Sequence, residues 1–73
     1  MATQIVMDRT GDSRHLFDQH DPTGLAEAEQ RFKSLTGQGF TAATRSRAGD
    51  LKVVRSFDPT ADETLFDPRL VGG

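Results

Sequence analysis

Residues Asp21–Gly39 read DPTGLAEAEQRFKSLTGQG and predict an amphipathic α-helix over about residues 22–36. Their apolar side chains recur at intervals of three and four, which places them on one stripe of a helix: Leu25, Ala28, Phe32 and Leu35. Asp21 is the predicted N-cap, because its carboxylate can accept from first-turn amides, and Pro22 suits the first helical position. Gly37 or Gly39 can adopt the left-handed conformation that ends a helix.

Runs rich in apolar and β-branched residues on both sides of this helix predict strands. The expected strands are residues 3–7, 14–17, 40–45 and 51–57, with turns at residues 9–12 and 47–50. Gly11 can supply the positive φ that the first turn requires. In the last strand, the alternation predicts one shared face for Leu51, Val53, Arg55 and Phe57.

The order strand, strand, helix, strand, strand predicts an α+β domain, with one helix packed on a four-stranded mixed or antiparallel sheet. Beyond Asp58 the pattern leaves open a short helical turn over residues 59–63 and a further strand over residues 64–66. Pro68 limits any ladder beyond that point. We therefore expect one domain over residues 1–66 and a mobile C-terminal tail over residues 67–73.

The composition limits how the domain can be stabilised. The chain has 73 residues and no Cys, Trp or Tyr, so it has neither disulfides nor a thiolate metal site. The expected core combines Leu, Val, Ile and Met with five aromatic residues: Phe17, Phe32, Phe40, Phe57 and Phe66. A core of this size supplies only about 3–5 kcal/mol. We expect a monomer or a weak homo-oligomer.

Charge and hydropathy narrow the expected partners. The net charge of −2 argues against wholesale nucleic-acid binding. There is no apolar run long enough to cross a membrane, and the first residues do not resemble a signal peptide. Together with the absence of cysteine, these features favour a cytoplasmic protein.

Several features together resemble the ubiquitin-like β-grasp family. They are an N-terminal strand, a hairpin through Thr10-Gly11, one central helix, the chain length and the ending Arg69-Leu70-Val71-Gly72-Gly73. The resemblance implies that the terminal glycine carboxylate is adenylylated and passed to a thiol or an amine. A narrow activating site would exclude any side chain larger than that of glycine. Gly72 and Gly73 are therefore a candidate conjugation tail. The basic residues that the family has just before its glycines are reduced here to Arg69.

The second predicted hairpin carries a cluster of cations. Arg45, Arg47, Lys52 and Arg55 lie within eleven positions and are a candidate patch for a protein partner or for phosphates. No aromatic residue is interleaved for base stacking. The acidic residues that follow can neutralise the patch within the molecule: Asp58, Asp62, Glu63 and Asp67.

The remaining motifs indicate no cofactor, metal or catalytic site. His15 and His20 lie near Asp12, Asp18 and Asp21, but their spacing matches no helical or knuckle ligand set. No Ser or Thr has a flanking pattern that would pair it with either histidine. We therefore expect a non-enzymatic adaptor that binds another protein, with nucleic-acid binding through the second hairpin as the alternative.

Overall fold

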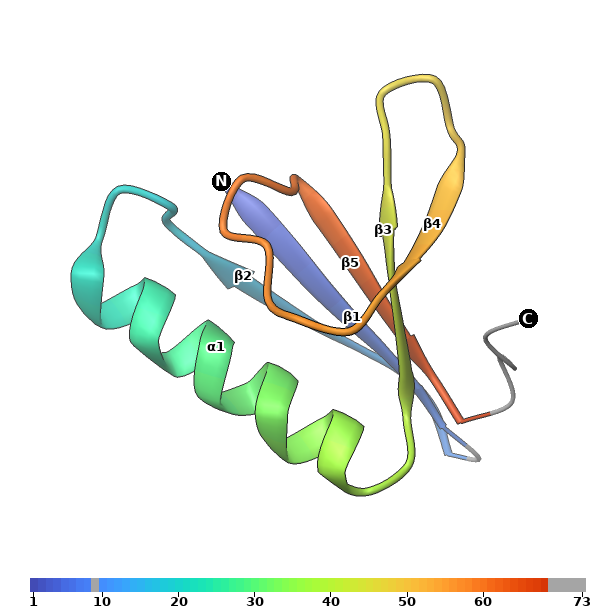
Figure 1. Cartoon of the computed structure of the whole chain (residues 1–73). Helices are drawn as coiled ribbons and strands as arrows, with labels where there is room; N and C mark the ends of the chain where they lie inside the picture. Colours follow the sequence, from blue (N-terminus) through green and yellow to red (C-terminus); the bar gives the residue numbers. More distant parts are fainter. Residues whose placement is uncertain (9, 69–73) are drawn as a thin grey trace.

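A computed structural model describes residues 1–8 and 10–68 and contains one helix packed on a five-stranded mixed sheet (Figure 1). The elements, in chain order, are β1 (Ala2–Asp8), β2 (Gly11–Phe17), α1 (Pro22–Gly37), β3 (Thr41–Arg45), β4 (Leu51–Val54) and β5 (Glu63–Asp67). The strand order is β2-β1-β5-β3-β4. The predicted α+β class is confirmed, and the sheet is β-grasp-like. It has one strand more than the four expected.

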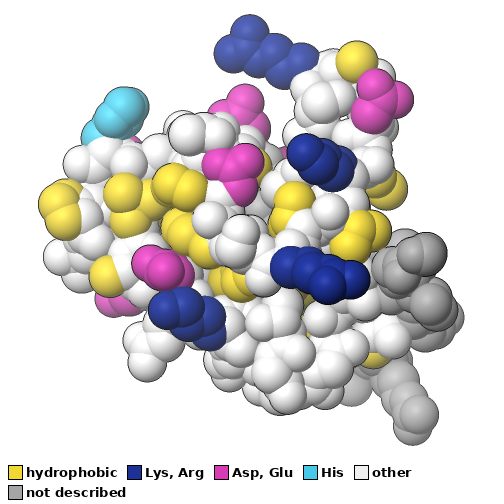
Figure 2. Space-filling model, viewed as in Figure 1, with side chains coloured by type: hydrophobic (Ala, Val, Ile, Leu, Met, Phe, Trp, Pro, Cys, Tyr) yellow, Lys and Arg dark blue, Asp and Glu magenta, His cyan; other side chains and the backbone are white. Residues whose placement is uncertain are grey.

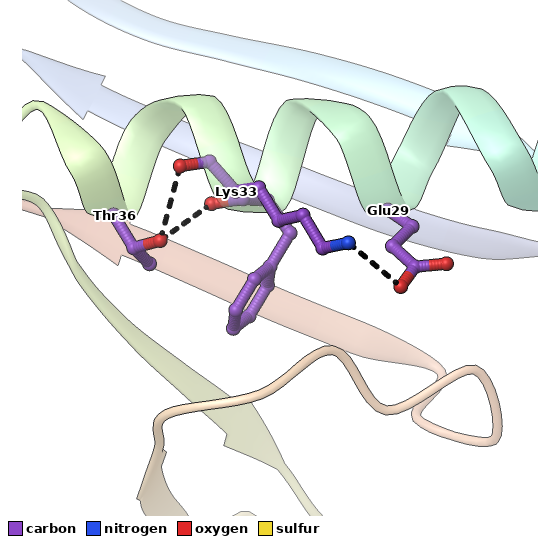
Figure 3. A network of polar contacts seen from close by, with 4 residues as sticks. Glu29, Lys33 and Thr36 are labelled. Carbon is purple, nitrogen blue, oxygen red and sulfur yellow. Dashed lines mark hydrogen bonds and ion pairs between the residues drawn. The ribbon is translucent and has the colours of Figure 1, made fainter.

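The predicted helix and both of its ends are confirmed. The Thr23 N–H donates to Asp21 Oδ1 at 3.2 Å, and Pro22 opens the helix. At the other end Gln38 is the C-cap and Gly39 has φ +102°, so Gly39 supplies the left-handed residue. On the exposed side Lys33 pairs with Glu29 at 3.5 Å, and Thr36 Oγ1 donates to the carbonyls of Phe32 and Lys33 (Figure 3).

The fifth strand occupies the middle of the sheet. β5 pairs in parallel with β1 and antiparallel with β3, so Leu65 lies between Ile5 and Ala43. β5 runs to Asp67, and residues 69–73, which make up most of the predicted tail, lie outside the described residues. The short helical turn that the sequence left open over residues 59–63 does not form. A single hydrogen-bonded turn, in which the Ala61 N–H donates to the Asp58 carbonyl at 3.3 Å, leads instead to β5, which begins at Glu63.

All five phenylalanines contribute to the core, as predicted. Phe32 and Phe66 are almost completely buried, and their ring centroids lie 5.6 Å apart in an edge-to-face arrangement. Phe57 contacts Phe32 at 6.0 Å and Phe17 at 6.3 Å, so it joins the two halves of the core. Phe40 packs at the margin beside Leu35. From the predicted helix stripe, Ala28 and Phe32 are buried, and Leu25 and Leu35 pack partly buried against them.

A buried polar residue joins the sheet to the helix. Gln4, on β1, has no exposed surface; its Nε2 donates to the Ala28 carbonyl at 3.0 Å. Its Oε1 accepts from Arg31 Nη1 at 2.7 Å. The amide is thus hydrogen-bonded at both ends, which offsets the cost of removing it from water.

The predicted shared face of residues 51, 53, 55 and 57 is wrong. β4 ends at Val54, and the chain bends at Arg55 and Ser56. Phe57 therefore turns under the sheet toward Phe32, whereas Leu51 and Val53 remain exposed on the other side. Alternation holds only while a strand stays paired, and the bend breaks it.

The two faces of the sheet are covered differently. Ala42 and its β4 partner Val54 pack with Phe32, so even-numbered residues of β4 face α1. The connection between β4 and β5 lies on the same side as α1 (Figure 1). The opposite, outer face carries Ile5, Leu65, Ala43 and Val53 in one cross-strand row. No helix among the described residues has the length and hydropathy needed to span a membrane.

Candidate interaction site at the second hairpin

The two edges of the sheet differ in character. β2 forms one edge and carries Asp12 and Arg14, charges of the kind that discourage pairing with another strand. β4 forms the other edge and reads Leu-Lys-Val-Val, with Lys52 its single charge. Leu51 and Val53 are 51% and 46% exposed on the outer face. The more apolar edge of the sheet is therefore at β4.

The candidate cations do not form one continuous positive patch, because acidic side chains lie among them. The Arg45 Nε lies 3.1 Å from Glu63 Oε1, because Arg45 and Glu63 lie side by side on the outer face of β3 and β5. Arg47 lies in the turn after β3, Lys52 faces the helix side, and Arg55 follows β4. In Figure 2 the dark-blue basic side chains around the hairpin are separated from one another, with magenta acidic side chains among them. The expected neutralisation within the molecule is confirmed for Arg45 and Glu63.

Three of the four cations line a shallow hollow with acidic residues. The hollow, of about 430 Å³, lies between the β3–β4 hairpin and the connection before β5, and Arg45, Arg47 and Lys52 contribute to it. Asp50, Asp58 and Asp62 line the same space. The mixture of both signs gives the hollow little preference for an anion or a cation.

A hydrogen-bonded turn borders this hollow. Asp58 Oδ1 accepts from Thr60 Oγ1 at 2.6 Å and from the Thr60 N–H at 2.9 Å. These bonds, the side-chain bond first, lower the pKa of Asp58, and the nearby Lys52 lowers it further. Asp8 and Thr10 make the same pair of bonds in the first hairpin, and they lower the pKa of Asp8 in the same way.

We expect Thr60→Val to raise the pKa of Asp58 toward its ordinary value, about 3.9, because the hydroxyl donor is lost. A carboxylate whose pKa is lowered on folding contributes stability above its unfolded pKa, and that contribution is lost as the pH falls through the folded pKa. The stability difference between parent and variant should therefore vanish at low pH. An NMR titration of the Asp58 carboxyl carbon measures the shift.

Thr10→Val is the matched control for this measurement, since it should raise the pKa of Asp8 and leave the pKa of Asp58 unchanged. An Asp58 titration that is the same in Thr60→Val and in the parent would contradict the hydrogen-bond assignment.

A second hollow borders the β4 edge on the helix side. It has a volume of about 320 Å³ and lies where α1 ends, between Phe40 and the last residues of β4. Its lining is mainly apolar or hydroxyl-bearing, with one cation: Thr36, Phe40, Thr41, Ala42, Val53, Val54 and Arg55. Arg55 makes no ion pair within 4 Å among the described residues.

The other predicted site residues are placed as follows. Gly72 and Gly73 lie outside the described residues. His15 is half-buried on β2. His20 is exposed before α1, where its backbone N–H donates to Asp18 Oδ1 at 2.9 Å. Within residues 1–8 and 10–68, no three His, Cys, Asp or Glu side chains are grouped so that they could hold a metal ion.

Two features of the site were missed by the sequence analysis. The exposure of Leu51 and Val53 was missed because their alternation was assumed to continue to Phe57. The hollow beside Phe40 was missed because it depends on where the helix end lies relative to β4. The signal for the first was the Arg55-Ser56 pair, which is a poor continuation of an apolar strand face.

The fold defines a class, the small α+β domains with one helix on a β-grasp-like sheet. Comparisons with protein-family models, with curated proteins and with solved structures find no match for this chain.

Proposed function

We propose that the protein is a small non-enzymatic protein-interaction module that binds its partner at the β4 edge. The observation that carries this proposal is the exposure of Leu51 and Val53 on an edge strand. An edge strand presents unpaired backbone groups, and native proteins commonly protect such edges with charge. The β2 edge has this protection, whereas β4 combines an open backbone edge with exposed apolar side chains.

A site-specific photocrosslinker tests the proposal in cells that express the protein. Benzoylphenylalanine at Leu51 is expected to capture a protein of discrete mass, and the same group at Leu16 is the matched control. Leu16 is 67% exposed and lies on the other edge, so exposure alone predicts at least as much capture there. Leu51→Ser with Val53→Ser should then abolish binding of the captured protein. Equal capture at both positions, or none at Leu51, would contradict the proposal.

A second candidate function is that of a ubiquitin-like modifier or carrier acting through Gly72 and Gly73. The observation that favours it is the β-grasp-like order, with β5 in the centre of the sheet leading directly to the C-terminal residues. Mass spectrometry of tagged protein from cells should then find Gly73 joined to an amine or a thiol. Deletion of the two glycines should remove every such adduct, and finding none with the intact chain would reject this function.

Nucleic-acid binding through Arg45, Arg47, Lys52 and Arg55 is the remaining alternative. The pairing of Arg45 with Glu63, and the carboxylates near Arg47 and Lys52, weigh against it. If this function is correct, affinity for oligonucleotides must fall steeply with salt. We expect no signal change for labelled single- or double-stranded oligonucleotides at low salt.

A further inference from the structure

We propose that the β4 edge accepts an extended acidic peptide, which adds as a sixth strand with one apolar side chain in the hollow beside Phe40. This inference rests on the proposed function and specifies the partner's chemistry. Strand addition uses backbone hydrogen bonds for affinity and pockets for alternate side chains for specificity. β4 offers both, because the hollow lies beside the end of the open edge.

The alternation of β4 specifies what each added residue would meet. Leu51 and Val53 point to the outer face, and Lys52 and Val54 point to the helix side. Residues of an added strand share the face of the residue that they oppose. An added residue opposite Val54 therefore lies next to the hollow of about 320 Å³, which has room for an apolar side chain. Residues opposite Leu51 and Val53 meet apolar side chains.

The charges at this edge select an acidic partner. Arg55 lines the hollow and has no ion pair within 4 Å in the described part of the chain. Lys52 is the one charged residue on β4, and it already interacts electrostatically with the Asp58 carboxylate. Arg55 lies at the bend just beyond β4, so an acidic residue next to the one opposite Val54 can reach it and gains more than one opposite Lys52. Opposite charges across neighbouring strands are favourable, and like charges are unfavourable.

This reasoning defines a probe peptide. In the antiparallel orientation, the pattern begins with an acidic residue beside Arg55 at the bend, and the residues opposite positions 54 to 51 are apolar, apolar, acidic and apolar. Acetyl-Ser-Glu-Val-Ile-Glu-Val-Ser-amide has this pattern. We expect saturable amide shifts in an NMR titration of the full chain, concentrated at residues 51–55 and at Phe40. The amides of β2 should not move, since that edge is charged.

Two control peptides separate strand addition from charge attraction alone. N-methylation of the backbone on the side facing β4 should abolish binding, because it removes the ladder donors while keeping the charges. Replacing both Glu residues with Lys should weaken binding at least about tenfold, which corresponds to 1.4 kcal/mol.

Charge-reversal variants test the assignment of the two cations. Arg55→Glu should weaken binding of the acidic peptide at least about tenfold, with a smaller loss for Lys52→Glu. The lysine peptide should bind Arg55→Glu better than it binds the parent. Arg14→Glu is the matched control on the other edge and should leave binding unchanged. Arg14, Lys52 and Arg55 are exposed, so these variants should fold.

Several outcomes would overturn the proposal. They are an absence of shifts, shifts centred on β2, equal binding of the N-methylated peptide, or self-association through β4 that excludes the peptide. The crosslinking result distinguishes failure of the acidic-strand proposal from failure of the proposed function as an interaction module. Specific capture at Leu51 without peptide binding would reject the acidic strand and leave the interaction module, whereas failure of both would reject both.

Discussion

Replacing Phe32 with alanine is expected to unfold the domain. Phe32 is 2% exposed and contacts the rings of Phe57 at 6.0 Å and Phe66 at 5.6 Å. Truncating a buried Phe to Ala costs about 3–5 kcal/mol, since it removes apolar contact and leaves a cavity. A core of this size supplies only about the same amount. Far-UV circular dichroism and thermal melting should show that Phe32→Ala lacks a cooperative transition.

Leu16→Ala is the matched control for this experiment. Leu16 is an apolar residue that is mostly exposed, so its truncation should change stability by no more than about 0.5 kcal/mol. A melting temperature for Phe32→Ala within a few degrees of the parent would mean that the helix stripe is not the core.

Leu65→Pro should also unfold the domain, for a different reason. Leu65 is in the central strand, with Ile5 on one side and Ala43 on the other. Proline has no N–H, so a ladder bond is lost in the middle of the sheet, where proline is not tolerated. The backbone carbonyl that would accept the N–H of residue 65 is left unpaired, which adds about 1–3 kcal/mol to the cost of losing the leucine side chain.

Leu65→Ala separates these two costs. It truncates the side chain, which is 6% exposed, but keeps the backbone donor. We expect Leu65→Ala to be destabilised and to retain dispersed amide signals in an NMR spectrum, and Leu65→Pro to lose them. A folded Leu65→Pro would contradict the placement of β5 between β1 and β3.

The identical tripeptides at residues 21–23 and 58–60 show how far local sequence determines structure. In both, the aspartate Oδ1 accepts from the N–H of the threonine two residues later. Fourteen residues of the amphipathic helix follow Thr23, enough to propagate it. After Thr60 only Ala61 and Asp62 precede β5, too few residues to offset the cost of helix nucleation. The turn is therefore local, and its continuation depends on the residues that follow.

The candidate site was only partly predictable, because its geometry depends on residues far apart in the chain as well as on local sequence. The four cations were identified on the correct hairpin, but their partners were not all predictable, since Glu63 reaches Arg45 only through the β3–β5 pairing. The exposed pair Leu51 and Val53 depends on a bend at Arg55. The hollow at Phe40 depends on the position of α1 relative to β4.

The sequence by itself determined α1, its caps, both hairpins and the choice of phenylalanines for the core. The helix, its caps and the hairpin turns arise from contacts between near neighbours, for which spacing, capping residues and glycine positions are sufficient. The phenylalanines were assigned to the core by their hydrophobicity alone, whereas the ring contacts that they make join residues far apart in the chain. Only the tertiary structure decided that β5 lies in the centre of the sheet, that Gln4 is buried against Ala28 and Arg31, and that β4 is left as an apolar edge. Each of these depends on pairing between residues far apart in the chain. The free energy of such pairing comes from the whole sheet and leaves no local pattern in the strand itself.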